Sequence, residues 1–244
     1  KLSLNHRHGY YGYGAYSHFE LDKKLIVEPM LFAKENTKTN ANYNSLETYY
    51  AGLRVYGDID SFYYDTTYVH QFGKKENVQG AKNDIDAFAF IGLVGYKINK
   101  DLKVGLEYAH ASGDKKDTQK IERFDGAFGA SDRYYGRMNL MQLENLRDYQ
   151  IFGIFNFGKK FNSKLEYHRF HADQTSDKWK AYTISGIDSR HYGDEIDLVT
   201  TYKHNKALSF QLGLSYFTRG DYITEASAKN QSITDDNAYA FFTQ

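Results

Sequence analysis

Apolar side chains recur at every second position in segment after segment of this chain, and no other feature constrains its fold as strongly. The clearest example is the segment that reads Leu102, Lys103, Val104, Gly105, Leu106, Glu107, Tyr108, Ala109. A period of two is the period of a β-strand, whose successive side chains point to opposite faces of the sheet. We therefore expect strands with one apolar face and one face of polar or small residues.

The same pattern predicts about 11 to 12 strands, the twelfth depending on the first eight residues. The others are expected at residues 9–21, 25–34, 46–58, 60–72, 84–98, 102–109, 149–157, 165–168, 192–203, 208–222 and 238–244. Short turns of about three residues alternate with polar loops of roughly 7 to 30 residues, an asymmetry typical of outer-membrane barrels. Pro29 lies inside one predicted strand and lacks a ladder donor, so we expect a bulge or a sheet edge there.

The aromatic residues indicate a membrane boundary. They make up 17% of the chain, with 23 Tyr, and cluster near the ends of the alternating segments, as at Tyr11 and Tyr13 or Tyr63 and Tyr64. Amphipathic rings of this kind favour the interface between lipid and water. No run of about 18 apolar residues exists to form a spanning helix. A closed β-barrel is the spanning structure that remains, because an open sheet edge in lipid leaves backbone groups without partners.

The predicted fold is therefore all-β: an antiparallel transmembrane β-barrel in the outer membrane of a Gram-negative bacterium, in contact with lipid. Residues 1–244 form a single barrel domain in this interpretation. The pattern is already that of a strand near Lys1, and the last strand stops at Gln244. We expect the barrel to be incomplete at the N-terminus and in the last strand.

Composition argues against a nucleic-acid partner and excludes any bond or site that needs cysteine. The 31 basic and 31 acidic residues balance, so nucleic acid is not an expected partner. The chain contains no Cys, which excludes disulfides and thiolate metal sites.

Several motifs between residues 84 and 244 resemble those of one known family. They are HASGDKKDTQ at 110–119, ERFDGAFG at 122–129, RYYGRM at 133–138, ENLRDYQIF at 144–152, LEYHRFHADQTSDKWK at 165–180 and GDEIDLVTTYKHNKALSFQLGLSYFTRGDYI at 193–223. In these motifs the chain resembles the C-terminal part of the alginate export family of outer-membrane barrels. The resemblance implies a barrel of about 16 to 18 strands. It also implies a passive channel for anionic or polar solutes, with an exopolysaccharide such as alginate among them.

Charged side chains that point into a barrel set the selectivity of its channel. The alternation places Arg54, Arg219, Lys103 and Lys34 on the inward face. A guanidinium group can hold the carboxylate of an anionic polysaccharide through two parallel hydrogen bonds. In an alternative that stays open, these bases instead pair with inward acids. Those acids are Glu107, Glu166, Glu195 and Asp197.

Two further arginines, Arg147 and Arg169, lie in the motifs of the family, and the resemblance implies that they belong to the pore or its rim. The alternation places both on the apolar side. We therefore expect them to lie beyond the hydrocarbon layer or to follow a bulge.

Two other functions are consistent with parts of the sequence. A structural or docking barrel would serve as one subunit of a complex with other envelope proteins and would fill its lumen with loops such as 113–145. An enzyme would need a base and a group that orients it, and His168 with His171 or His110 with Asp114 could supply them. No nucleophile motif accompanies either pair, so we expect no enzymatic activity.

Metal binding has equally weak support. His6 and His8 share one face of a segment, and Asp173 and Asp177 lie in a predicted loop. Neither pair has a recognised ligand spacing. We expect no metal and no other cofactor.

Overall fold

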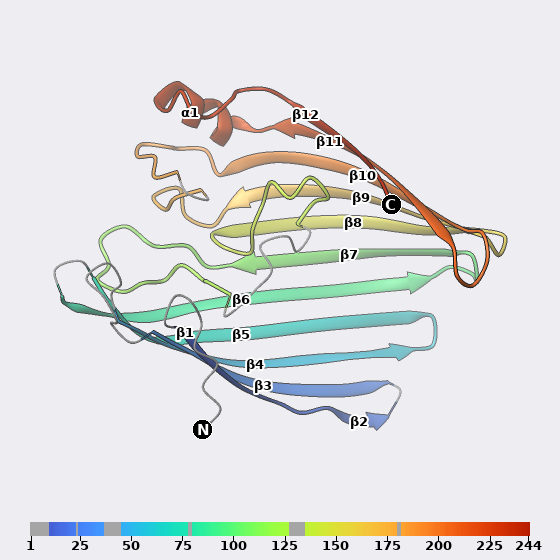
Figure 1. The fold of residues 1–244 in the computed structure, drawn as a ribbon, viewed down its shortest axis with the longest axis horizontal. Helices are drawn as coiled ribbons and strands as arrows, with labels where there is room; N and C mark the ends of the chain where they lie inside the picture. The colour runs from blue at the N-terminus through green and yellow to red at the C-terminus, as the bar shows by residue number, and fades with distance from the viewer. Residues whose placement is uncertain (1–9, 23, 37–44, 78–79, 127–134, 180–181) are drawn as a thin grey trace.

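The computed structural model describes residues 10–22, 24–36, 45–77, 80–126, 135–179 and 182–244. They form one antiparallel sheet of 12 strands and one helix (Figure 1). The elements are β1 (Tyr10–Tyr16), β2 (Phe19–Asp22), β3 (Leu25–Asn36), β4 (Leu46–Ile59), β5 (Phe62–Glu76), β6 (Lys82–Lys97), β7 (Leu102–Ala111), β8 (Leu146–Phe157), β9 (Phe161–Ala172), β10 (His191–Lys203), β11 (Ser209–Arg219), α1 (Asp221–Lys229) and β12 (Ala238–Thr243).

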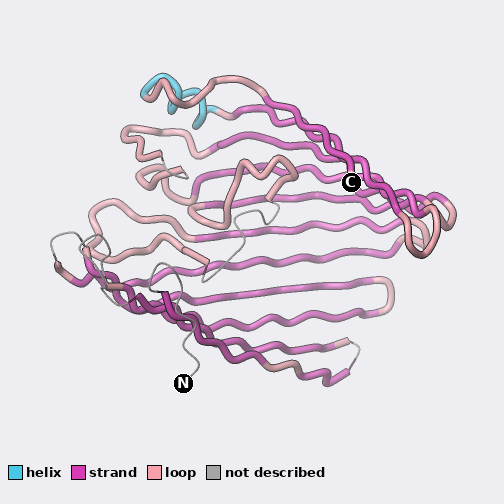
Figure 2. The backbone as a smooth tube through the Cα atoms, in the orientation of Figure 1, coloured by secondary structure: helices cyan, strands magenta, loops and turns pink. Residues whose placement is uncertain are grey.

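Strands that follow one another in the chain pair side by side from β3 to β12, while β1 and β2 both pair with β3. The short turns lie at one end of the sheet and the long loops at the other (Figures 1 and 2). The predicted all-β antiparallel architecture is confirmed. Among the described residues the sheet has β1 and β2 at one edge and β12 at the other, and it is not closed on itself.

The two faces of the sheet differ in chemistry, as the period of two predicts. Most of its exposed large apolar side chains lie on one face, here called the apolar face. Examples are Leu53, Leu106, Ile151, Leu165, Leu198 and Leu212. The other face is here called the polar face. It carries Glu28, Arg54, Glu107, Asp148, Glu166, Glu195 and Asp197. A sheet with this partition presents one side to lipid and the other to water or protein.

The core lies on the polar face, under the long loops and α1. Fourteen buried apolar residues form its main cluster; they are Ala109, Tyr135, Met141, Leu146, Phe170, Ala172, Ile184, Ile187, Tyr192, Phe217, Tyr222, Ile223, Ala226 and Ile233. Tyr192 of β10 packs edge-on against Tyr222 of α1, with ring centroids 4.5 Å apart. Burying these side chains removes apolar area from water, so loops and helix are held against β7 to β11.

One predicted strand is too long. Residues 208–222 were expected to be extended, but β11 ends at Arg219 and α1 begins at Asp221 after Gly220. Asp221 in the first turn and Lys229 in the last turn both complement the helix dipole. Within the described part of the chain, no helix is long and apolar enough to cross a membrane.

Residues 9–21 were predicted as one strand, and the structure divides the described part of this segment into β1 and β2. The interruption at Ser17 and His18 lies opposite Pro29 of β3, in a register that is the same on either side. The Ser17 N–H donates to the Pro29 carbonyl at 3.2 Å. The N–H that proline lacks would point to the same neighbour. Pro29 therefore interrupts the neighbouring strand, in place of the predicted bulge or sheet edge.

Candidate functional site

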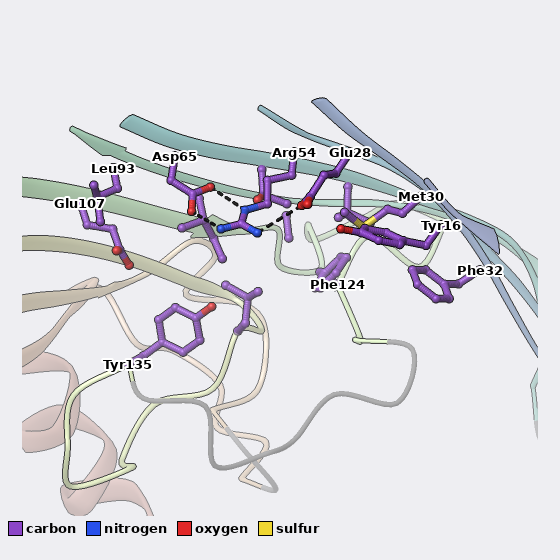
Figure 3. A pocket seen from close by; sticks show the side chains of 15 residues that line it. Tyr16, Glu28, Met30, Phe32, Arg54, Asp65, Leu93, Glu107, Phe124 and Tyr135 are labelled. Carbon is purple, nitrogen blue, oxygen red and sulfur yellow. Dashed lines mark hydrogen bonds and ion pairs between the residues drawn. The ribbon is translucent and has the colours of Figure 1, made fainter. Parts of the chain in front are cut away.

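A cavity of about 580 Å³ lies between the polar face of the first strands and the loop that joins β7 to β8. Strand residues form one side of it, and Phe124, Tyr135 and Leu143 of the loop form the other. Figure 3 shows Glu28, Arg54 and Asp65 projecting from the sheet, with Phe124 and Tyr135 on the loop side.

Arg54 lies in this cavity between two carboxylates from neighbouring strands. Its Nε lies 2.8 Å from Oδ1 of Asp65, its Nη2 lies 2.5 Å from Oδ2 of the same residue, and its Nη1 lies 3.2 Å from Oε2 of Glu28. Tyr56 and His18 also hydrogen-bond to Glu28. Arg54 lies on the polar face, as its parity predicts, and its partners Glu28 and Asp65 are not among the acids named in the alternative.

Aromatic side chains line the same cavity beside these charges. They are Tyr16, Phe32, Phe124 and Tyr135. Tyr50 extends this aromatic side, since its ring packs edge-on against Phe124 and its hydroxyl donates to the Asp125 carbonyl at 2.6 Å. The loop segment 122–126 is thereby fixed against β4.

Of the other predicted inward residues, Glu107 also lines the cavity. Lys34 lies near the long-loop end of β3, with Nζ 3.3 Å from Oδ2 of Asp125. Lys103 lies on the polar face near the short-turn end, where it pairs in register with Lys97.

Glu195 was predicted to line the pore, but its side chain is fully buried. Its Oε1 accepts a hydrogen bond from the Met138 N–H at 2.9 Å, and Asp197 accepts one from the Arg137 N–H at 3.1 Å. The Arg137 guanidinium also bonds to Glu166. Glu195 does not line an open pore, because the loop segment 135–145 covers these inward acids.

Arg219 has the predicted inward parity, but it binds the loop after α1. Its Nε lies 2.8 Å from Oδ1 of Asp235, and its Nη1 lies 3.0 Å from the Thr224 hydroxyl. Arg219 thus fixes the end of β11 to the helix and the following loop.

Arg147 and Arg169 lie on the apolar face at the long-loop end, the position that the alternation predicts. Arg147 is the second residue of β8 and bonds to Asp173. Arg169 lies three residues before the end of β9, with Nε 3.8 Å from Oδ1 of Asp194. A register shift in β10 lies next to Arg169, between His191 and Gly193.

The two suggested catalytic pairs do not assemble. His168 lies on the polar face against Asp148, whereas His171 lies on the apolar face. His110 bonds to Asp173 rather than to Asp114, whose carboxylate accepts backbone N–H groups of residues 122 and 123. His6 and His8 lie outside the described residues.

The loop carboxylates Asp173 and Asp177 bind cationic side chains. Asp177 lies 3.0 Å from Nη1 of Arg123. Burial raises the pKa of Asp173, but hydrogen bonds from His110, the Gly113 N–H and Arg147 outweigh it and hold that pKa well below its usual value. In the described part of the chain, no three His, Cys, Asp or Glu side chains are grouped to hold a metal.

Sequence reasoning did not single out Glu28, Asp65, Arg123 or Arg137. The period of two could have found Asp65, because it alternates with the apolar residues of its strand. Arg123 and Arg137 lie within the motifs ERFDGAFG and RYYGRM. No local pattern indicates what they bind, because their partners come from loops and strands distant in sequence.

Comparison with known proteins decides the family. The profile of the family described as "Alginate export" matches residues 12–234. The chain belongs to the alginate export family. The resemblance in its motifs and the expected location in the Gram-negative outer membrane are therefore confirmed.

One relative is the alginate production protein AlgE of Pseudomonas aeruginosa, which is 27% identical over 161 residues. That match covers 59% of this chain and 31% of the relative, so the chain spans less than a third of that protein's length.

Three solved structures also align with this chain. The NanC porin has a TM-score of 0.46 at 8% identity, with 97% of this chain and 92% of that one covered. The outer membrane channel DcaP of Acinetobacter baumannii has a TM-score of 0.48 at 10% identity (84% and 55% covered). The outer membrane protein OprD of Pseudomonas aeruginosa has a TM-score of 0.47 at 12% identity (93% and 67% covered).

Proposed function

We propose that this chain forms part of the wall of an outer-membrane channel through which an anionic or polar saccharide chain diffuses. The observation that carries the proposal is the cavity at Arg54, which opens on the polar face of a sheet whose other face is apolar. In a membrane, the apolar face contacts lipid and the polar face contacts the solute.

The chemistry of the cavity fits a saccharide. A guanidinium group binds the carboxylate of a sugar acid, and the carboxylates of Glu28 and Asp65 accept hydrogen bonds from sugar hydroxyls. The aromatic rings of Tyr16 and Phe124 offer flat apolar surfaces to the C–H faces of sugar rings.

Binding at this site is expected to be weak, because Arg54 is already paired. A solute carboxylate can bind the Arg54 guanidinium only by displacing a carboxylate of the protein. The negative charges of Glu28 and Asp65 also repel it. Weak binding suits a conduit, since a solute that binds tightly cannot leave.

In this proposal residues 1–244 act as a single stretch of barrel wall. The full protein's solute is an exopolysaccharide of the alginate type, and the chain carries out no catalytic step. Family membership and the matched relative support the class of solute.

A second candidate is a docking barrel that belongs to a complex with other envelope proteins. The packed core under the loops favours it, because these loops fill the space over the polar face of β7 to β11. The two candidates differ in one property: whether water and solute pass the cavity at Arg54.

Conductance separates them. The full-length protein is inserted in planar bilayers, and single channels are recorded with and without an oligosaccharide of uronic acids. We expect open channels that the oligosaccharide blocks transiently, and a shorter block in Arg54→Gln. Arg169→Gln, on the apolar face, is the matched control, and the oligosaccharide should block its channels for as long as it blocks the wild type. A correctly inserted protein that never conducts would favour the docking barrel.

A further inference from the structure

Near their long-loop ends, β7 to β10 carry three cross-strand rows of side chains on the apolar face. The row nearest the middle of the strands is Leu106, Ile151, Tyr167 and Ile196; the next is Tyr108, Tyr149, Arg169 and Asp194; the last, here called the basic row, is His110, Arg147, His171 and His191. Chemistry thus changes from apolar through aromatic to basic within a few residues along each strand.

This order matches the layers of a membrane. Aliphatic side chains belong in hydrocarbon, tyrosines at its boundary, and basic residues at the depth of the lipid head groups. Long loops mark the outer side of an outer-membrane barrel, so the basic row lies in the head-group layer of the outer leaflet.

The basic row is held in place by its neighbours. Oδ1 of Asp173 lies 2.9 Å from Nε2 of His110 and 2.7 Å from Nη2 of Arg147. The rings of His171 and His191 lie 5.2 Å apart between centroids. The donors of this row are therefore positioned before any ligand arrives.

Arg169 is an accessible cation beside this row. Its side chain is 53% exposed, and its Nε lies 3.8 Å from Oδ1 of Asp194. Asp194 already accepts the Tyr167 hydroxyl at 2.7 Å and lies 3.0 Å from Nε2 of His191. The ion pair of Arg169 is thus long and its carboxylate is shared.

We propose that Arg169 and the basic row bind the phosphate groups of an outer-leaflet lipid. A guanidinium group offers two parallel N–H donors that match the oxygens of a phosphate, and imidazoles and tyrosine hydroxyls add further donors. The negative charges of Asp173 and Asp194 offset the positive charges of Arg147 and Arg169. Recognition therefore depends on the positions of the hydrogen-bond donors and not on net charge. The proposal rests on the outer-membrane location and not on the passage of saccharide.

The test measures lipid binding by the full-length protein in detergent, using native mass spectrometry with lipid A that carries two phosphates and with lipid A that carries none. We expect preferential binding of the phosphorylated lipid, and binding that is weaker by about tenfold or more in Arg169→Gln, because a charge-assisted hydrogen bond is lost. Lys159→Gln combined with Lys206→Gln removes two exposed cations from the short turns at the opposite end and should bind like the wild type.

Three results would overturn the proposal. They are equal binding of the two lipids, equal binding by wild type and Arg169→Gln, and loss of lipid binding on addition of inorganic phosphate at equal concentration, which would indicate a site for free anions. Arg169→Gln should keep the single-channel conductance of the wild type, so failure of lipid binding and failure of the channel proposal are separate outcomes.

Discussion

Arg54 of β4 and Asp65 of β5 form a two-point ion pair on the polar face, with Nε to Oδ1 at 2.8 Å and Nη2 to Oδ2 at 2.5 Å. Glu28 approaches the same guanidinium from β3. One cation therefore lies between two anions at the wall of the cavity, and removing either sign of charge should change what the cavity admits.

We expect Arg54→Gln to shift the selectivity of the channel toward cations and Asp65→Asn to shift it toward anions. A unit charge acts on an ion 4 Å away with about 1 kcal/mol in water, so the permeability ratio should change roughly fivefold. Reversal potentials in a salt gradient measure this ratio. Shifts of the same sign in both variants would contradict the expectation.

Arg123 should be essential for the outer loops. Its side chain is 9% exposed and bonds to Glu144, Asp177 and the Lys178 carbonyl, so it joins two loops. Arg123→Ala leaves the buried carboxylate of Asp177 without its cation, which costs about 3 to 5 kcal/mol. Hydrogen exchange of segment 112–126 measures the loss. Lys120→Ala breaks an exposed pair with Asp86 and should cost less than about 1 kcal/mol; equal effects would refute this account.

The packing of segment 112–114 should weaken in acid because of Asp173. Its pKa is lower in the folded protein than the value of about 3.9 in an unfolded chain. The carboxylate therefore stabilises the folded loops above about pH 4, and this stabilisation is lost as the pH falls toward the folded pKa. Hydrogen exchange between pH 3 and 7 should show this loss in the wild type. Asp173→Asn should be less protected at pH 7 and lack the same pH dependence.

Gly136 allows the loop to contact Glu195. Its φ is +77°, and a Cβ at this position would lie 2.5 Å from Oε2 of Glu195. We expect Gly136→Ala to lift the loop and to expose the bond after Arg137 to trypsin. Gly158→Ala is the control, because its φ is also positive but its Cβ would contact nothing within 4 Å. A trypsin-resistant Gly136→Ala protein would show that the contact does not hold the loop.

The strands were predictable because their period is local. Leu106 and Glu107 are neighbours in the sequence, and a strand must place them on opposite faces. The parity of Arg54, Arg147 and Arg169 follows from the same rule and agrees with the structure. The family was also recognisable from its motifs.

The coverage of the polar face was not predictable from the sequence. Glu195 has the parity of a lumen residue, and only the return of the loop at Met138 reveals that it is buried. Arg219 has the same parity but binds Asp235, a residue of the loop that follows α1. The helix was missed because Tyr222 shares the parity of the apolar residues of β11, although it lies in α1 and packs against Tyr192.

The central claim is that the polar face borders water and the apolar face borders lipid, and cysteine labelling tests it most directly. The chain contains no Cys, so Arg54→Cys and Leu53→Cys each introduce one thiol on opposite faces of β4. Both variants are inserted in planar bilayers and treated with a bulky, charged thiol reagent that does not cross lipid. We expect the reagent to reduce the current through Arg54→Cys channels and to leave Leu53→Cys channels unchanged. The opposite pattern, or no current in either variant before treatment, would contradict the account.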